Sequence, residues 1–100
     1  MGDRTAPIDS QRLVHRHRMR IRTIAVSFAA AVSSAHRDLV VGPAERDALI
    51  ETWRIWSLEV LERYDREIQA LRDAPDAPSE EELADLRSRL DDAIVAVREA

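Results

Sequence analysis

The chain has 100 residues, of which 45% are hydrophobic and 34% are charged, with only two glycines, four prolines and no cysteine. A chain of this length forms one small domain, and this composition excludes collagen-like and intrinsically disordered proteins. Without cysteine there is no disulfide framework, thiolate nucleophile or zinc–thiolate site, which agrees with a reducing, cytoplasmic location. The abundance of Ala, Leu, Glu and Arg predicts an all-α fold.

The net charge of −4 conceals a gradient along the chain. Residues 1–41 hold seven arginines against three acidic residues, whereas residues 74–100 hold three arginines against eight acidic residues. The chain is therefore basic at its start and acidic at its end. All fifteen basic residues are arginine, which indicates a coding bias and weakens any argument that one particular site was selected for a guanidinium group.

The first predicted helix contains the segment HRHRMRIR, residues 15–22, in which every second residue is arginine. A strand would place these arginines on one face, but the alternation stops at Arg22, whereas a helical apolar period continues to Leu39. With Asp9 as the expected N-cap, we predict a helix over about residues 10–38. Its apolar arc consists of Val14, His17, Ile21, Ile24, Ala25, Phe28, Ala31, Val32, Ala35 and Leu39.

Two further helices are predicted beyond this one. Pro43 suits the first position of a helix over about residues 43–72, with Gly42 before it as a cap. The segment DAPDAP, residues 73–78, is a stiff linker, and Ser79 with Glu82 forms a capping box that opens a third helix over about residues 79–99. The apolar arc of the second helix contains Leu49, Ile50, Trp53, Trp56, Val60, Leu61, Tyr64, Ile68 and Leu71, so both tryptophans are expected in the core.

Short connections between the helices predict a three-helix antiparallel bundle within a single domain over residues 1–100, with dimerisation as an alternative way to complete the core. The first two helices would each be ~43 Å long and the third ~30 Å long. Because the third helix is shorter, we expect the closed end of the hairpin to be poorly covered. We also expect the acidic residues 80–85 to lie near the arginines of residues 12–22.

No residue spacing in the chain predicts a catalytic, cofactor-binding or metal site. His15 and His17 point in nearly opposite directions on a helix, and no His-Glu-x-x-His spacing brings further ligands to them. Glu59 and Glu62 each precede an arginine by four residues, which is typical of a solvated helix face. We therefore expect a protein that is not an enzyme and has no small-molecule substrate.

The favoured function is a protein–protein interaction or adaptor module that packs its helices against a partner, including a second copy of itself. Ile55 and Leu58 lie opposite the apolar arc of the second helix and form one candidate contact surface. The other candidate surface is the poorly covered end of the hairpin, with Val40, Val41, Leu49 and Ile50.

Two alternatives remain open at the level of sequence. The chain could be a nucleic-acid-binding regulator that contacts phosphates through Arg12, Arg16, Arg18, Arg20 and Arg22. It could also be an exported protein, because a basic segment followed by an uncharged stretch that ends at Ala35 resembles a signal peptide. The uncharged stretch is too short to span a bilayer, so a membrane protein is not expected.

Overall fold

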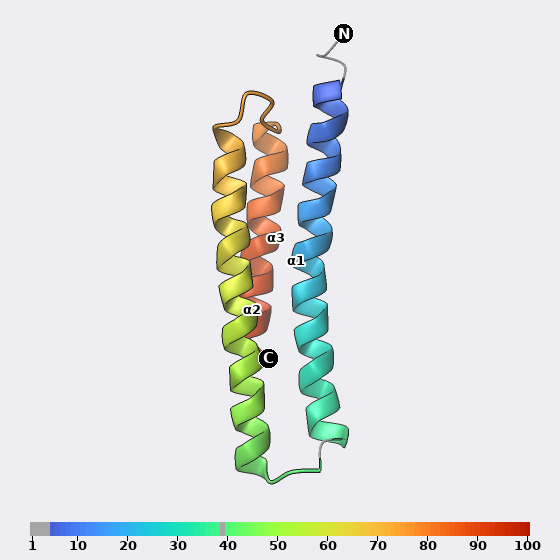
Figure 1. Ribbon diagram of the computed structural model, residues 1–100, viewed down its shortest axis with the longest axis vertical. Helices are drawn as coiled ribbons and strands as arrows, with labels where there is room; N and C mark the ends of the chain where they lie inside the picture. The colour runs from blue at the N-terminus through green and yellow to red at the C-terminus, as the bar shows by residue number, and fades with distance from the viewer. Residues whose placement is uncertain (1–4, 39) are drawn as a thin grey trace.

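The computed structural model describes residues 5–38 and 40–100, with side chains from residue 11 onward. It contains three helices, α1 (Thr5–Asp38), α2 (Pro43–Arg72) and α3 (Glu80–Glu99), and each of them packs against the other two. Figure 1 shows that consecutive helices run in opposite directions. The prediction of an all-α three-helix antiparallel bundle is therefore confirmed.

The core follows a seven-residue repeat. Val14, Ile21, Phe28 and Ala35 are buried at heptad spacing on α1. On α3 the buried residues alternate at spacings of three and four, and they are Leu83, Leu86, Leu90, Ala93 and Val97. Such spacings place an apolar seam along one side of a helix that packs at a shallow angle against its neighbours. The result is a rod with extents of 61 × 18 × 16 Å.

The start of α1 differs from the prediction. The helix begins at Thr5 rather than near Ser10, so Asp9 lies within the helix and does not cap it. Pro7 permits this extension because it falls in the first turn, where backbone N–H groups have no partner within the helix. Leu39, which was expected at the end of the apolar arc, lies outside the described residues.

The ends of α2 and α3 agree with the prediction. Gly42 is the N-cap of α2 and Pro43 follows at its first position. At the start of α3, the Ser79 hydroxyl accepts a hydrogen bond from the Glu82 backbone N–H at 3.1 Å, and the Glu82 carboxylate accepts one from the Ser79 N–H at 3.2 Å. This capping box satisfies donors that would otherwise be unpaired at the helix terminus.

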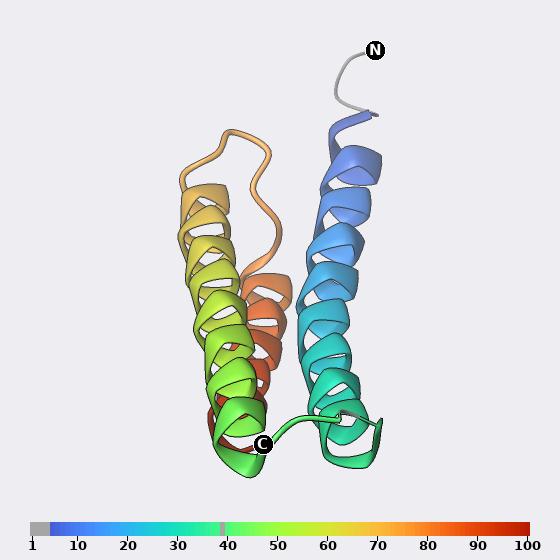
Figure 2. The same cartoon turned by 60° about the horizontal axis from the view of Figure 1, so that its bottom comes forward.

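The closed end of the hairpin is only partly open to solvent. Figure 1 shows α1 and α2 continuing beyond the end of α3, and Figure 2 shows the connection between them at this end of the rod. Val40, Val41 and Leu49 are exposed there, as expected. Ile50 is buried in the core, so its assignment to a partner-binding surface was wrong. Its side chain belongs to the core cluster, as do Phe28 and Ala35 of α1.

Candidate interaction surface

The arginines of the basic segment of α1 contact two different neighbouring helices. Arg18 donates a hydrogen bond to the Asp85 carboxylate on α3 at 2.9 Å, and Arg89 donates to the same carboxylate at 2.9 Å. These hydrogen bonds, led by the one from Arg89, lower the pKa of Asp85. The expected approach of the acidic start of α3 to the basic segment is therefore confirmed at Asp85.

Arg20 has its partners on α2, which the sequence did not indicate. Its guanidinium group bonds to the Glu67 carboxylate at 3.2 Å and lies 4.2 Å from the centroid of the Tyr64 ring. Both partners project from α2 one turn apart, so they hold the guanidinium group in an ion pair and a cation–π contact together.

The five arginines proposed for nucleic-acid binding therefore do not form one free surface. Arg18 and Arg22 line a groove between α1 and α3, whereas Arg20 faces α2. Arg12 and Arg16 are exposed on α1. Two of the five, Arg18 and Arg20, are held by carboxylates of the same molecule.

His17 is the one polar residue among the buried side chains of the described part of the chain. Burial lowers the pKa of His17, and the neighbouring Arg20 and Arg16 lower it further, while Glu67 raises it. Its Nδ1 atom has no hydrogen-bond partner within the described residues. His15 and His36 are exposed, and the described residues contain no cluster of three or more side chains that could hold a metal ion.

Arg54 connects α2 to the end of α3 through contacts that sequence reasoning missed. Its Nε donates a hydrogen bond to the Val97 carbonyl at 3.1 Å, and Nη2 donates to the main-chain oxygen of Ala100 at 2.6 Å. The guanidinium group also lies 5.6 Å from the centroid of the Phe28 ring on α1. Arg54 thus caps the negative end of the α3 dipole and contacts all three helices.

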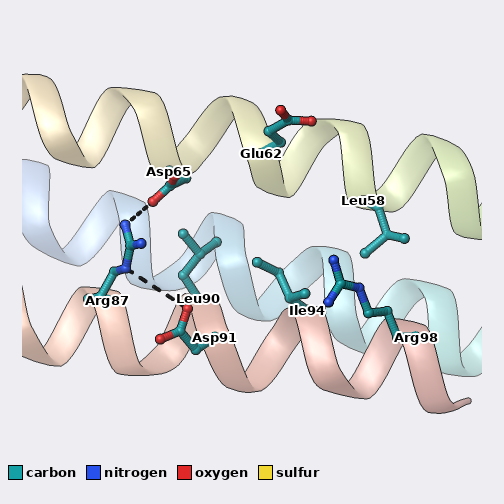
Figure 3. Close-up of a pocket in the computed structure, with 8 residues that line it drawn as sticks. All are labelled: Leu58, Glu62, Asp65, Arg87, Leu90, Asp91, Ile94 and Arg98. Carbon is teal, nitrogen blue, oxygen red and sulfur yellow. Dashed lines mark hydrogen bonds and ion pairs between the residues drawn. The ribbon is translucent and has the colours of Figure 1, made fainter.

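A groove of about 190 Å³ runs between α2 and α3. Its apolar floor is formed by Leu58, Leu90 and Ile94, as Figure 3 shows. Charged side chains border this floor on both sides. Glu62 and Asp65 come from α2, and Arg87, Asp91 and Arg98 come from α3. The groove is therefore an apolar strip with an acidic edge on α2 and a mixed edge, with two arginines, on α3.

Of the two predicted contact residues of α2, only Leu58 lines this groove. Leu58 is half-buried because it packs against the core as well as lining the groove. Ile55 precedes Leu58 by one turn and is 49% exposed. Ile55 is thus exposed, whereas Leu58, which was expected opposite the apolar arc, packs partly against the core.

The two tryptophans of α2 do not share one environment. Trp53 is half-buried and packs against the core, as expected. Trp56 is 61% exposed, so its assignment to the core was wrong. It lies about 120° around the helix from the buried Ile50, beyond the arc that α1 and α3 cover.

No known protein family, curated protein or solved structure matches this chain. None of the three described helices combines the length and the apolarity needed to cross a membrane. The chemistry of the candidate surface is therefore the basis for the functional proposal.

Proposed function

We propose that this protein is a non-catalytic interaction module that packs its helices against a protein partner, and that it binds a second copy of itself. The observation that carries the proposal is the groove between α2 and α3, which has an apolar floor and charged edges, together with the exposed Ile55 one turn before Leu58. Apolar side chains held on regular helices lose little conformational freedom when a partner covers them, so their burial favours association. A cytoplasmic location is part of the same proposal.

The exposed apolar residues at the hairpin end form a separate candidate surface. Val40 is 98% exposed, and Val41 and Leu49 are also exposed. Exposed branched aliphatic side chains bury a large apolar area when a partner covers them. A second protein partner could therefore bind at this end while the groove between α2 and α3 stays free.

The contacts of the basic segment favour these protein partners over nucleic acid. Arg18 and Arg20 are already engaged by Asp85 and Glu67. A duplex would have to displace these carboxylates, which reduces the gain from neutralising phosphates. The test is a titration with a labelled duplex and a labelled single strand at low and at moderate salt. Steeply salt-dependent binding would support the nucleic-acid alternative instead.

The exported alternative is disfavoured by the core. Cleavage after Ala35 would remove Val14, Ile21 and Phe28, which are buried between the other two helices. The two remaining helices would then expose the apolar surfaces that α1 covers, at a cost of roughly 1.5–3 kcal/mol for each large side chain. The intact mass of the protein from its native host would reveal such a cleavage.

Substitution at the groove tests the proposed self-association. We expect the double variant Ile55→Glu/Leu58→Glu to be monomeric when the wild-type protein is dimeric in sedimentation equilibrium, because two carboxylates would have to be buried in the interface. Leu58 also packs against the core, so Ile55→Glu alone serves as a second variant that leaves the core intact. Val26→Glu, at an exposed valine of α1, is the matched control. A solution mass unchanged by Ile55→Glu and by the double variant would contradict the proposed contact surface.

A further inference from the structure

The N-terminal half of α1 contains a buried imidazole that fits its site only when it is neutral. His17 is 3% exposed, and its Nδ1 atom is buried without a hydrogen-bond partner among the described residues. A neutral imidazole needs no hydrogen on this nitrogen, because its single N–H can be at Nε2. Protonation adds an N–H group at Nδ1 that has no acceptor there, so the charged form of His17 is disfavoured in the closed bundle.

The charged groups of α1 and α2 around His17 do not compensate for its burial. Burial is the main cause of the lowered pKa of His17, and the cations Arg20 and Arg16 lower it further, against the opposite effect of Glu67 on α2. The Glu67 carboxylate already accepts a hydrogen bond from Arg20 at 3.2 Å, and the Tyr64 ring of α2 lies against the same guanidinium group. An imidazolium at His17 would therefore compete with Arg20 for this carboxylate.

On α3, the carboxylate that contacts this segment of α1 is Asp85. It accepts hydrogen bonds from Arg89 and from Arg18, the residue that follows His17, both at 2.9 Å. These bonds, led by the one from Arg89, lower the pKa of Asp85, so this group stays ionised in the range where histidine titrates. Mild acid therefore changes the charge of His17 while Asp85 keeps its own charge.

The two halves of α1 are attached to the bundle in different ways. The C-terminal half is joined to α2 by a short connection, and Phe28 and Ala35 are buried there. The N-terminal half lies far from this connection, as Figure 1 shows, and has Val14 and Ile21 as buried apolar residues. Its two ion pairs to α2 and α3 are partly exposed, and such pairs contribute little to stability. Because segments near a helix end open most easily, this half is the part of α1 that separates first.

We infer that His17 is a pH-sensitive switch: when its imidazole takes up a proton, residues 11–24 of α1 separate from α2 and α3 while the rest of the bundle stays folded. Separation brings the imidazolium into water, where its charge is solvated. It also uncovers apolar side chains of α2 and α3 near the level of Arg20 and Arg18, so the protein gains an apolar surface in mild acid. The buried residues that become exposed are Tyr64, Ile68, Leu83 and Leu86. The switch acts within one chain, so it does not depend on the proposed self-association.

Hydrogen exchange of the backbone amides, resolved along α1 by NMR, tests the switch. The protection factor is the ratio of the intrinsic to the observed exchange rate, so it corrects for the direct effect of pH on exchange. Between about pH 7.5 and about pH 5.5, we expect the protection factors of residues 11–24 to fall about five- to tenfold. The reason is that opening is linked to the uptake of one proton by a group whose pKa in the open state is near 6.5. Residues 28–36 should keep their protection factors.

Two variants at His17 and one at His15 identify the group that titrates. His17→Leu and His17→Gln both remove the titratable ring, one with an apolar and one with a polar side chain. In both, the protection factors of residues 11–24 should no longer depend on pH. His15→Leu, at an exposed position of the same segment, is the matched control and should keep the pH dependence of the wild type. Circular dichroism confirms that each variant is folded.

Each contrary outcome overturns a stated part of the inference. Protection factors of residues 11–24 that do not change with pH in the wild type overturn the switch. A loss of equal size in both halves of α1 also overturns it, because the bundle then opens as a whole. A loss that persists in both His17 variants shows that another group carries the pH dependence and overturns the role of His17.

Discussion

At the scale of single residues, His17 shows how an apolar position can hold a titratable group. The imidazole takes a core position of α1, one turn before Ile21 and three turns before Phe28, and is only 3% exposed. Burial and the nearby Arg20 lower its pKa, so the folded protein favours the neutral imidazole. The unfolded chain, by contrast, takes up a proton near pH 6.5.

This difference predicts a loss of stability in mild acid. Because the pKa of His17 is lower in the folded protein, its contribution is fully present above about pH 6.5 and decreases as the pH falls below that value. At about pH 5.5 the loss reaches at most ~1.4 kcal/mol relative to about pH 7.5. His17→Leu should remove this part of the pH dependence, and the exposed His15→Leu should not. Urea unfolding at the two pH values measures the free energy of unfolding of each variant. If this free energy depended on pH equally in His17→Leu and in the wild type, the prediction would be contradicted.

Arg54 is the residue whose role depends most on tertiary structure. We expect Arg54→Met to destabilise the fold by about 1–2 kcal/mol, because the Val97 carbonyl and the main-chain oxygen of Ala100 lose a charged donor while the aliphatic part of the side chain remains. Urea unfolding measures the change, with the exposed Arg63→Met as control. A loss no larger than that of the control would show that water replaces the guanidinium group without cost.

The sequence could not indicate this role of Arg54. The partners of Arg54 are main-chain oxygens at the end of α3, so they can be identified only when the register of α3 against α2 is known. The same limit applies to the pair of Arg20 and Glu67, because these residues lie on separate helices. By contrast, His17 could be assigned to the apolar face from the helical period alone.

At the scale of the elements, the helix boundaries follow local signals where those signals are strong. Ser79→Ala should cost about 1 kcal/mol of unfolding free energy, because the hydroxyl that accepts from the Glu82 N–H is lost. Ser88→Ala, at an exposed position within α3, should have little effect. Thermal unfolding of both variants tests the cap, and equal melting temperatures would contradict its role.

Local signals were misleading where two of them competed. Asp9 is a good N-cap residue, but the preceding turn with Pro7 is equally able to begin a helix, and α1 begins at Thr5. Trp56 falls at the margin of a broad apolar arc of α2, and it is 61% exposed. The width of an apolar arc therefore predicts that a helix has two neighbours, and not which residues at its margin become exposed.

At the scale of the whole molecule, the charge gradient along the chain becomes a pattern across the bundle. The basic segment of α1 lies beside the acidic start of α3, where Arg18 is paired with Asp85. The groove between α2 and α3 is bordered by further charged side chains, which are Glu62, Asp65, Arg87, Asp91 and Arg98. Its floor of Leu58, Leu90 and Ile94 is the feature for which a partner is proposed.

The solution mass of the wild-type protein, measured by sedimentation equilibrium over a wide range of concentrations, decides whether it binds a second copy of itself. We predict a mass that rises from 11.4 kDa, that of one chain, to twice this value and then stays constant, because a two-fold contact closes on itself. A mass that remains that of one chain at the highest concentration would contradict self-association and the groove contact together.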